Sequence, residues 1–202
     1  MIRLFAQLAV VVGLFVSGAA QADTITFGNE DIYTSYGSTY SEAGYLFTNT
    51  AELDTWGNLD TSDSDTTSSN TLFTNFPQST TTITRVDSAA FDLASIDFDD
   101  VYHQGSPSGF LSFAYTFAGG GTGTGSFLVD TVPGLATAIL GLTNLASFSF
   151  TPDANLSFVQ FDNAQVSLAT TPIPAALPLF ASALVGLGVI GGRRKQRGTG
   201  AA

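Results

Sequence analysis

The sequence contains no cysteine among its 202 residues, and only six residues are lysine or arginine. The absence of cysteine excludes disulfides, thiolate metal ligands and cysteine nucleophiles. The six basic residues face seventeen aspartates and glutamates, which gives a formal net charge of −11. Because nucleic-acid binding needs clustered Lys and Arg against the phosphates, this composition argues against a nucleic-acid partner.

Charged residues of either sign are scarce, at 11% of the chain, whereas glycine alone contributes 21 residues. Such a composition favours short strands and loops over solvated helices. The length fits one ordinary domain with additional end segments.

Residues 1–22 have the features of a secretory signal peptide. Arg3 supplies the positive start, Leu4–Val16 an apolar run, and Ala20 and Ala22 an A-x-A cleavage pattern. The alternative is an N-terminal membrane anchor, for which a run of about 13 residues is short. We therefore expect export through the Sec translocon and cleavage by signal peptidase after Ala22.

A second apolar segment lies near the other end, where residues 175–192 carry no charge. As a helix this segment would span about 27 Å, enough to cross a thin bilayer. Basic residues follow at once and predict a cytoplasmic stop, formed by Arg193, Arg194, Lys195 and Arg197. The alternative is a plain C-terminal tail anchor with a proline-rich hinge.

A short proline-containing motif precedes this apolar segment and consists of Thr171, Pro172, Ile173, Pro174 and Ala175. Motif, span and basic stop together resemble the VPLPA variety of the PEP-CTERM sorting signal over residues 171–197. Thr171 replaces the Val of that pattern and Ile173 replaces its Leu, but the proline spacing is retained. The resemblance implies a Gram-negative host, processing by an exosortase at the inner membrane, and association with extracellular polysaccharide or biofilm matrix. Residues 198–202 form a tail.

The region between these signals, 23–170, is predicted to be one all-β ectodomain. It holds one base, Arg85, against all seventeen acids, a net charge of −16. Apolar and polar residues alternate through its segments, most clearly at Leu111, Phe113, Tyr115 and Phe117. This period of two indicates strands with one apolar face. The apolar phase shifts between Leu93 and Ile96, which predicts a bulge or corner.

Turn signals separate the predicted strands at 105–109, 119–125 and 152–155, and the polar stretch 60–70 is predicted to be a mobile loop. No stretch of ten or more residues has convincing helical periodicity; 132–145 comes closest, but Pro and Gly interrupt it. We therefore predict an antiparallel β-sandwich that is jelly-roll-like. The order of its elements also resembles carbohydrate-binding β-sandwich domains.

Catalytic signals are weak, so we predict that the protein is not an enzyme. The only histidine, His103, lies beside a turn, and no nucleophile elbow precedes a helix. A secreted glycan hydrolase is the alternative, but no spacing singles out a carboxylate pair. The Gly-rich run 119–125 lacks the Lys and following helix of a phosphate-binding loop and is predicted to be a hairpin connection.

Calcium is the metal that suits an exported acidic chain, because it prefers carboxylate and carbonyl oxygens. Glu30 and Asp31 follow the opening strand, and Asp162 and Asn163 lie on the closing one. We hypothesise that the first and last strands lie together and that these residues form a structural calcium site. The alternative is a solvated acidic surface, with Asp162 and Asn163 at an exposed strand edge.

Aromatic residues offer a second kind of site, since aromatic rings stack on the apolar faces of sugars. The candidates are Tyr33, Tyr36, Tyr40 and Trp56. The three tyrosines lie among Ser, Thr and Gly, which favours exposure; the alternative is core packing or loop filling. The sequence thus predicts an exported, non-enzymatic surface or matrix protein associated with polysaccharide. An adhesin that retains its C-terminal membrane anchor is the other possibility.

Overall fold

The computed structural model describes residues 22–27, 34–56, 70–100, 108–130, 134–156 and 158–169, with only the backbone described for Thr55 and Trp56. Contacts divide the chain into two units, Met1–Ala169 and Thr170–Ala202, and every described residue belongs to the first. Most of the predicted signal peptide and all of the predicted sorting signal lie outside the described residues.

The described residues form eleven β-strands. Their bounds are β1 (Ala22–Ile25), β2 (Thr39–Glu42), β3 (Tyr45–Asn49), β4 (Leu53–Trp56), β5 (Thr71–Thr74), β6 (Thr81–Arg85), β7 (Phe91–Asp100), β8 (Gly109–Phe117), β9 (Thr122–Val129), β10 (Ala136–Pro152) and β11 (Val159–Leu168). This part of the chain contains no helix of the length and apolar character needed to cross a membrane.

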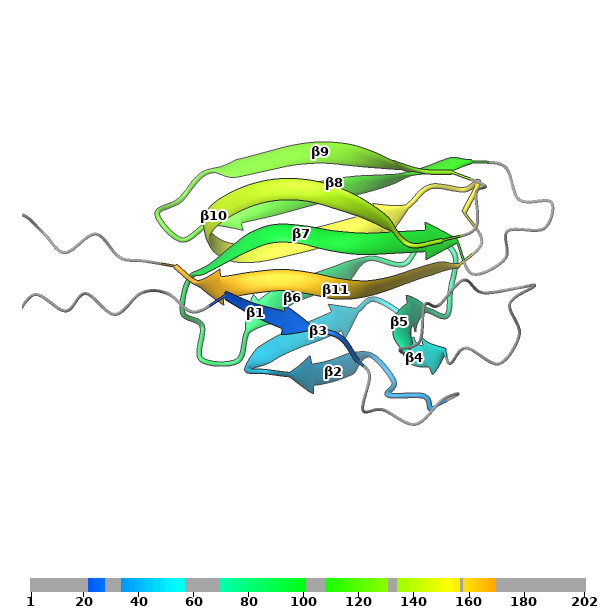
Figure 1. The fold of residues 1–202 in the computed structure, drawn as a ribbon, viewed down its shortest axis with the longest axis horizontal. Coiled ribbons are helices and arrows are strands. Elements are labelled where there is room, and N and C mark those ends of the chain that lie inside the picture. Colours follow the sequence, from blue (N-terminus) through cyan, green and yellow to red (C-terminus); the bar gives the residue numbers. More distant parts are fainter. Residues whose placement is uncertain are drawn as a thin grey trace, which may run out of the picture. The chain divides into compact units, whose positions relative to one another are not determined.

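The strands form two layers that share β10, which is 17 residues long (Figure 1). The first half of β10 pairs with β7, which continues the first layer through β11 to β1 on one side and to β5 and β4 on the other. The second half pairs with β6 and β8, which continue the second layer to β3, β2 and β9. Every pairing is antiparallel, and the prediction of an antiparallel β-sandwich is confirmed.

Bulges interrupt the long strands β7 and β10. On β7, Leu93 and Ser95 face the consecutive residues Val166 and Gln165 of β11, so Ala94 is an extra residue. This bulge confirms the phase shift predicted between Leu93 and Ile96. The first half of β10 has two further register shifts against β7, close to the positive φ angles of Gly141 and Asn144 (59° and 58°). Such bulges increase local twist and let one strand serve both layers.

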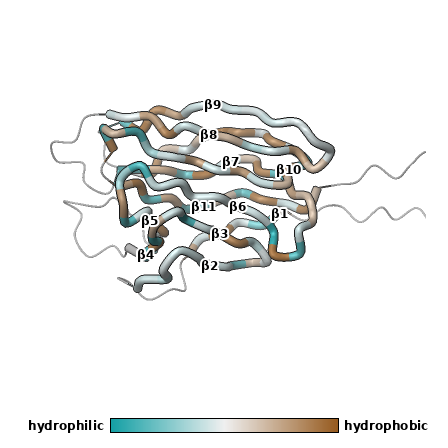
Figure 2. The backbone as a smooth tube through the Cα atoms, turned by 180° about the vertical axis from the view of Figure 1, so that it is seen from behind, coloured by the Kyte–Doolittle hydropathy of each residue, from teal (hydrophilic) through white to brown (hydrophobic). Residues whose placement is uncertain are grey.

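Phenylalanine rings fill the space between the layers. Phe161 of β11 contacts Phe150 of β10, and Phe98 of β7 contacts the same ring, each with ring centroids 5.0 Å apart. Phe27, which follows β1, packs edge-on against Phe47 and Phe161. Figure 2 shows the corresponding alternation of apolar and polar positions along the strands. Every residue of this core lies between Ile25 and Val166, so the sandwich within residues 22–169 has a core of its own.

The first and last strands lie side by side, as the sequence predicted. β1 pairs with β11 so that Ala22 faces Ser167 and Ile25 faces Ala164. On its other side β11 pairs with β7, and Asp162 is fully buried. Asp162 therefore does not lie on a solvated surface, as the alternative to the metal site supposed.

Candidate functional site

Aromatic rings on β8 lie opposite glycines on β9. Tyr115 faces Gly123 and Phe113 faces Gly125 across the ladder. A Cβ on Gly123 would lie 2.4 Å from two atoms of the Tyr115 ring, so this ring lies across the backbone of β9. A Cβ on Gly125 would be 3.9 Å from Phe113, which is ordinary contact. Gly123 thus gives the Tyr115 ring its position.

These rings line a groove of about 210 Å³. It runs along the side of the sandwich between β9 and the first half of β10, where the described residues provide no strand to join the two layers. Tyr115 and Phe127 are partly buried, and Ile139 is 86% exposed. The lining consists of Phe113, Tyr115, Thr124, Gly125, Ser126, Phe127, Ala138, Ile139, Leu140 and Leu142.

The described lining of the groove carries no formal charge. The stretch 104–152, which supplies all ten lining residues, contains a single charged residue, Asp130. All other acids of the ectodomain lie elsewhere in the sequence, so −15 of its net charge of −16 lies outside this stretch. A lining with aromatic rings and without charge suits an uncharged ligand better than an ionic one.

Sequence reasoning missed this groove. It predicted the run 119–125 to be a hairpin connection, but the turn covers only 118–121 and the remaining residues belong to β9. Glycine was taken for a turn signal, whereas at Gly123 it makes room for a ring. Two signals were available: the near absence of charge over 104–152, and the match of alternating aromatics on one segment with alternating glycines on the next.

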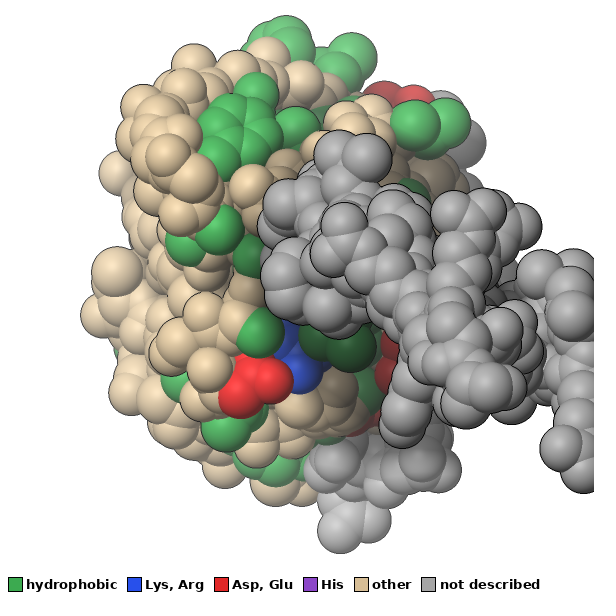
Figure 3. Space-filling view, turned by 90° about the vertical axis from the view of Figure 1, so that its left-hand side faces the viewer, with side chains coloured by type: hydrophobic (Ala, Val, Ile, Leu, Met, Phe, Trp, Pro, Cys, Tyr) green, Lys and Arg blue, Asp and Glu red, His purple; other side chains and the backbone are tan. Residues whose placement is uncertain are grey.

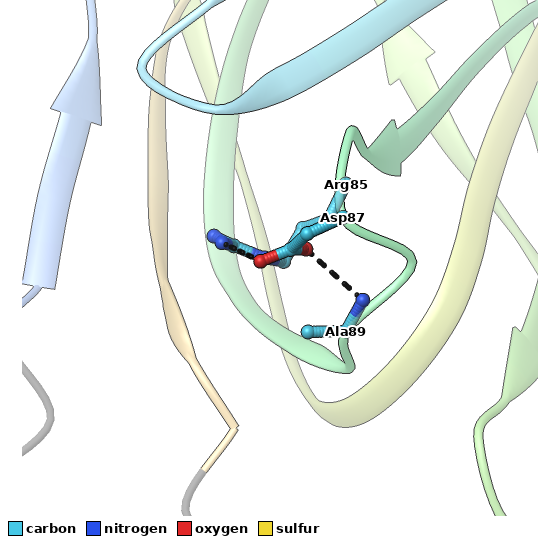
Figure 4. Close-up of polar contacts among 3 residues, drawn as sticks. All are labelled: Arg85, Asp87 and Ala89. Carbon is cyan, nitrogen blue, oxygen red and sulfur yellow. Dashed lines mark hydrogen bonds and ion pairs between the residues drawn. The ribbon is translucent and has the colours of Figure 1, made fainter.

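A second hollow of about 310 Å³ surrounds Arg85, the only described basic residue. Figure 3 shows its side chain recessed beside a carboxylate. Nε and Nη2 of Arg85 donate to the two carboxylate oxygens of Asp87 at 2.9 and 2.8 Å, and the Ala89 N–H donates to the same carboxylate (Figure 4). The guanidinium also lies 5.2 Å from the centre of the Tyr45 ring.

These contacts hold the Arg85 side chain in place. Hydrogen bonding from Arg85 lowers the pKa of Asp87 to about 2, and the same contact raises the pKa of Arg85. Burial raises the pKa of Tyr45. Asp23 is a second acidic residue at this hollow, beside the Arg85–Asp87 pair. The arrangement fixes the turn between β6 and β7 and does not favour an anionic ligand.

The structure places Tyr40 in the core, which bears out the alternative of core packing for this residue and not the exposure that its polar neighbours favoured. Tyr40 is 6% exposed because it pairs with Phe47 on the inward face of the β2–β3 hairpin. Its ring contacts Phe27 and Tyr36, and its hydroxyl donates to Glu42 at 2.9 Å. Tyr36 is partly buried. Tyr33 and the side chain of Trp56 lie outside the described residues.

Asp162 and Asn163 take part in polar contacts within the first layer. Asp162 is fully buried and accepts a hydrogen bond from the Asn163 N–H at 2.7 Å. The Asn163 side chain donates to Asp97 at 3.0 Å. Glu30 and Asp31 are outside the described residues, among which no group of three or more His, Asp and Glu side chains is arranged to hold a metal ion.

The other candidate residues also lie outside the described part of the chain. They are His103, Ala20 of the cleavage pattern, the motif residues 171–175 and the basic residues of the predicted stop. Ala22 is described and is the first residue of β1.

No protein-family model and no curated protein matches the sequence. Among solved structures, a DUF4465 family protein from Bacteroides ovatus is similar at 7% identity and a TM-score of 0.47, over 73% of this chain and 99% of that one. The CBM22-1 xylan-binding domain of Paenibacillus barcinonensis Xyn10C is 12% identical with a TM-score of 0.44, over 78% and 100%. The tandem CBM22-1-CBM22-2 domain of the same protein gives 12% and 0.45 over 77% of this chain, which spans about half (48%) of it. At TM-scores below 0.5, these similarities do not identify a ligand for this chain.

Proposed function

We propose that the sandwich binds a neutral glycan in the groove between β9 and β10, as part of an exported, non-enzymatic surface or matrix protein. The observation that carries this proposal is the described lining of the groove, which carries no charge and includes the rings of Tyr115 and Phe127. Aromatic rings pack against the C–H faces of pyranose rings, and a few polar groups in such a site fix the orientation of the ligand.

The charge distribution supports a neutral ligand over an acidic one. The ectodomain has a net charge of −16, and its field repels anionic polymers at moderate salt. The groove offers no cation to offset that repulsion, because Arg85 lies in the other hollow and is paired with Asp87. A neutral polysaccharide is not repelled by this field and needs no cation in the groove.

The lining of the groove supports binding without hydrolysis. Most glycoside hydrolases place two carboxyl groups on either side of the scissile bond, about 5–9.5 Å apart. None of the ten described lining residues is acidic. A glycan in this groove would therefore be held but not cleaved.

Export and sorting form the second part of the proposal and are supported by the two ends of the sequence. Signal peptidase would release the chain after Ala22, and the helix at 175–192 would hold it in the inner membrane. An exosortase would then cut at or near residues 172–175 and deliver the protein to the surface or matrix of a Gram-negative cell. Intact mass of the mature protein tests this step, since retention of residues 176–202 would favour the anchored adhesin.

A structural calcium ion belongs to the same proposal, at Asp162 and Asn163 together with Glu30 and Asp31. Oxygen ligands of this kind suit calcium. Binding of glycan in the presence of calcium and of a chelator tests this part separately.

The decisive experiment measures binding of residues 22–169 to neutral and to uronic-acid polysaccharides by affinity electrophoresis and calorimetry. We expect binding to a neutral polymer, and a loss of about tenfold or more in Tyr115→Ala because one stacking platform is removed. Phe110→Ala is the matched control, since this ring on the opposite face of β8 is 50% exposed and does not line the groove. Equal losses in both variants, or binding to acidic polymers only, would contradict the proposal.

A further inference from the structure

β9 is the unpaired edge of the second layer. Among the described residues it pairs with β8 alone. The β8–β9 register continues without a bulge from Gly109 opposite Val129 to Thr116 opposite Thr122. One side of this eight-residue strand therefore presents unpaired backbone donors and acceptors, which can pair with a further strand.

β9 has none of the features that normally protect such an edge. Proteins block edge strands with charges, prolines, bulges or short length. The edge strands β1 and β2 of the described sandwich follow this rule: they are four residues each and carry Asp23 and Glu42. The first half of β10 is interrupted by two register shifts. By contrast, β9 has eight residues, pairs with β8 without a register shift, and contains neither a charged residue nor a proline.

The charge of the molecule points to the partner. Two copies of an ectodomain with a net charge of −16 repel each other wherever their acidic surfaces meet. The segment 104–129, which contains β8 and β9, carries no acidic or basic residue. This hairpin is therefore where two copies can approach with the least repulsion, whereas a basic partner would be drawn to the acidic remainder.

We propose that β9 pairs antiparallel with β9 of a second copy of this chain, so that the second layer continues across a two-fold axis. A two-fold interface of this kind uses the same strand on both copies. Phe110 and Leu128 face each other across β8 and β9 on the outer face and are 50% and 49% exposed. They lie next to the junction and become more buried in the pair.

The expected dimer is weak and concentration-dependent, because a single strand of eight residues forms a small interface. The pairing does not depend on the proposed glycan function, so each is tested on its own.

Sedimentation equilibrium of residues 22–169 over a range of concentrations tests the pairing. Ser126 on β9 and Ser112 on β8 are exposed direct neighbours on the same face, one at the edge and the other a strand further in. We expect the wild-type protein and Ser112→Glu to dimerise, and Ser126→Glu to raise the dissociation constant about tenfold or more through like-charge repulsion at the junction. A wild-type protein that stays monomeric, or equal weakening by both substitutions, overturns the proposal.

Cysteine cross-linking supplies an independent measurement in this cysteine-free chain. A disulfide needs Cα atoms about 4.4–6.8 Å apart, a distance that facing residues of paired strands satisfy. Under oxidation, Thr124→Cys and Ser126→Cys, alone or mixed, should give covalent dimers, and Ser112→Cys should not. A dimer in solution that none of the β9 cysteines traps, or that Ser112→Cys traps equally well, contradicts the β9 pairing.

Discussion

Replacing Phe161 by alanine should destabilise the sandwich more than any change to an exposed phenylalanine. The Phe161 ring is fully buried and has its centroid 5.0–6.4 Å from four others, those of Phe27, Phe47, Phe98 and Phe150. Truncating a buried ring of this size to alanine loses its burial energy and leaves a cavity, which together cost about 3–5 kcal/mol of stability. The free energy of unfolding of a typical domain is only about 5–15 kcal/mol, so the loss is a large share of the total.

Urea unfolding of residues 22–169, followed by circular dichroism, measures this loss. With a urea dependence of about 2 kcal/mol per molar, we expect the midpoint to fall by about 2 M. Phe161→Leu retains part of the ring's volume and should cost less, which provides a measurable variant if the alanine protein does not fold.

Phe110→Ala is the control for this prediction, because it deletes the same atoms from a residue that is 50% exposed. It should cost less than about 1 kcal/mol. The reasoning fails if Phe161→Ala and Phe110→Ala lower the midpoint equally, since the core would then not depend on the ring that links the two layers.

Two further predictions concern the groove and the arginine. Gly123→Ala should lower the free energy of unfolding by about 1–3 kcal/mol and weaken glycan binding, because its Cβ would lie 2.4 Å from the Tyr115 ring. Gly125→Ala is the control and should leave thermal stability and binding nearly unchanged, because its Cβ would lie 3.9 Å from Phe113. Equal effects of the two substitutions would refute this prediction. Asp87 has its pKa lowered from 3.8 to about 2 in the folded protein, so the stability it contributes is present above pH 3.8 and is lost as the pH falls toward 2. The difference in melting temperature between wild type and Asp87→Asn should therefore shrink over that range, and a difference that grows toward pH 2 would contradict the assignment.

The sequence predicted those parts of the fold that depend on local pattern. Strand β8 was evident because its inward and outward residues alternate, and the bulge at Ala94 was evident because the alternation slips there. The burial of Tyr40 was not predictable from its neighbours, since it depends on the pairing of Tyr40 with Phe47 in the hairpin. Glu30 and Asp31 are outside the described residues, so the predicted metal site is not tested.

The groove was harder to foresee because three strands must come together before it exists. Tyr115, Phe127 and Ile139 lie on β8, β9 and β10, and no spacing in the sequence relates them. What the sequence does contain is the uncharged stretch 104–152, which is recognisable once the acids of the rest of the domain are counted.

The pairing of β1 with β11 also determines how the sandwich responds to tension. Ala22 faces Ser167, so the start of the first strand and the end of the last lie at the same end of the ladder. A pull that separates these two ends peels β1 from β11 and breaks their hydrogen bonds one after another. A pull on Leu168 along the axis of β11 instead slides β11 along β7, to which its first and last residues are both paired. Hydrogen bonds perpendicular to that direction share the load and yield together. The last strand thus resists a pull along its own axis better than a pull that separates it from β1.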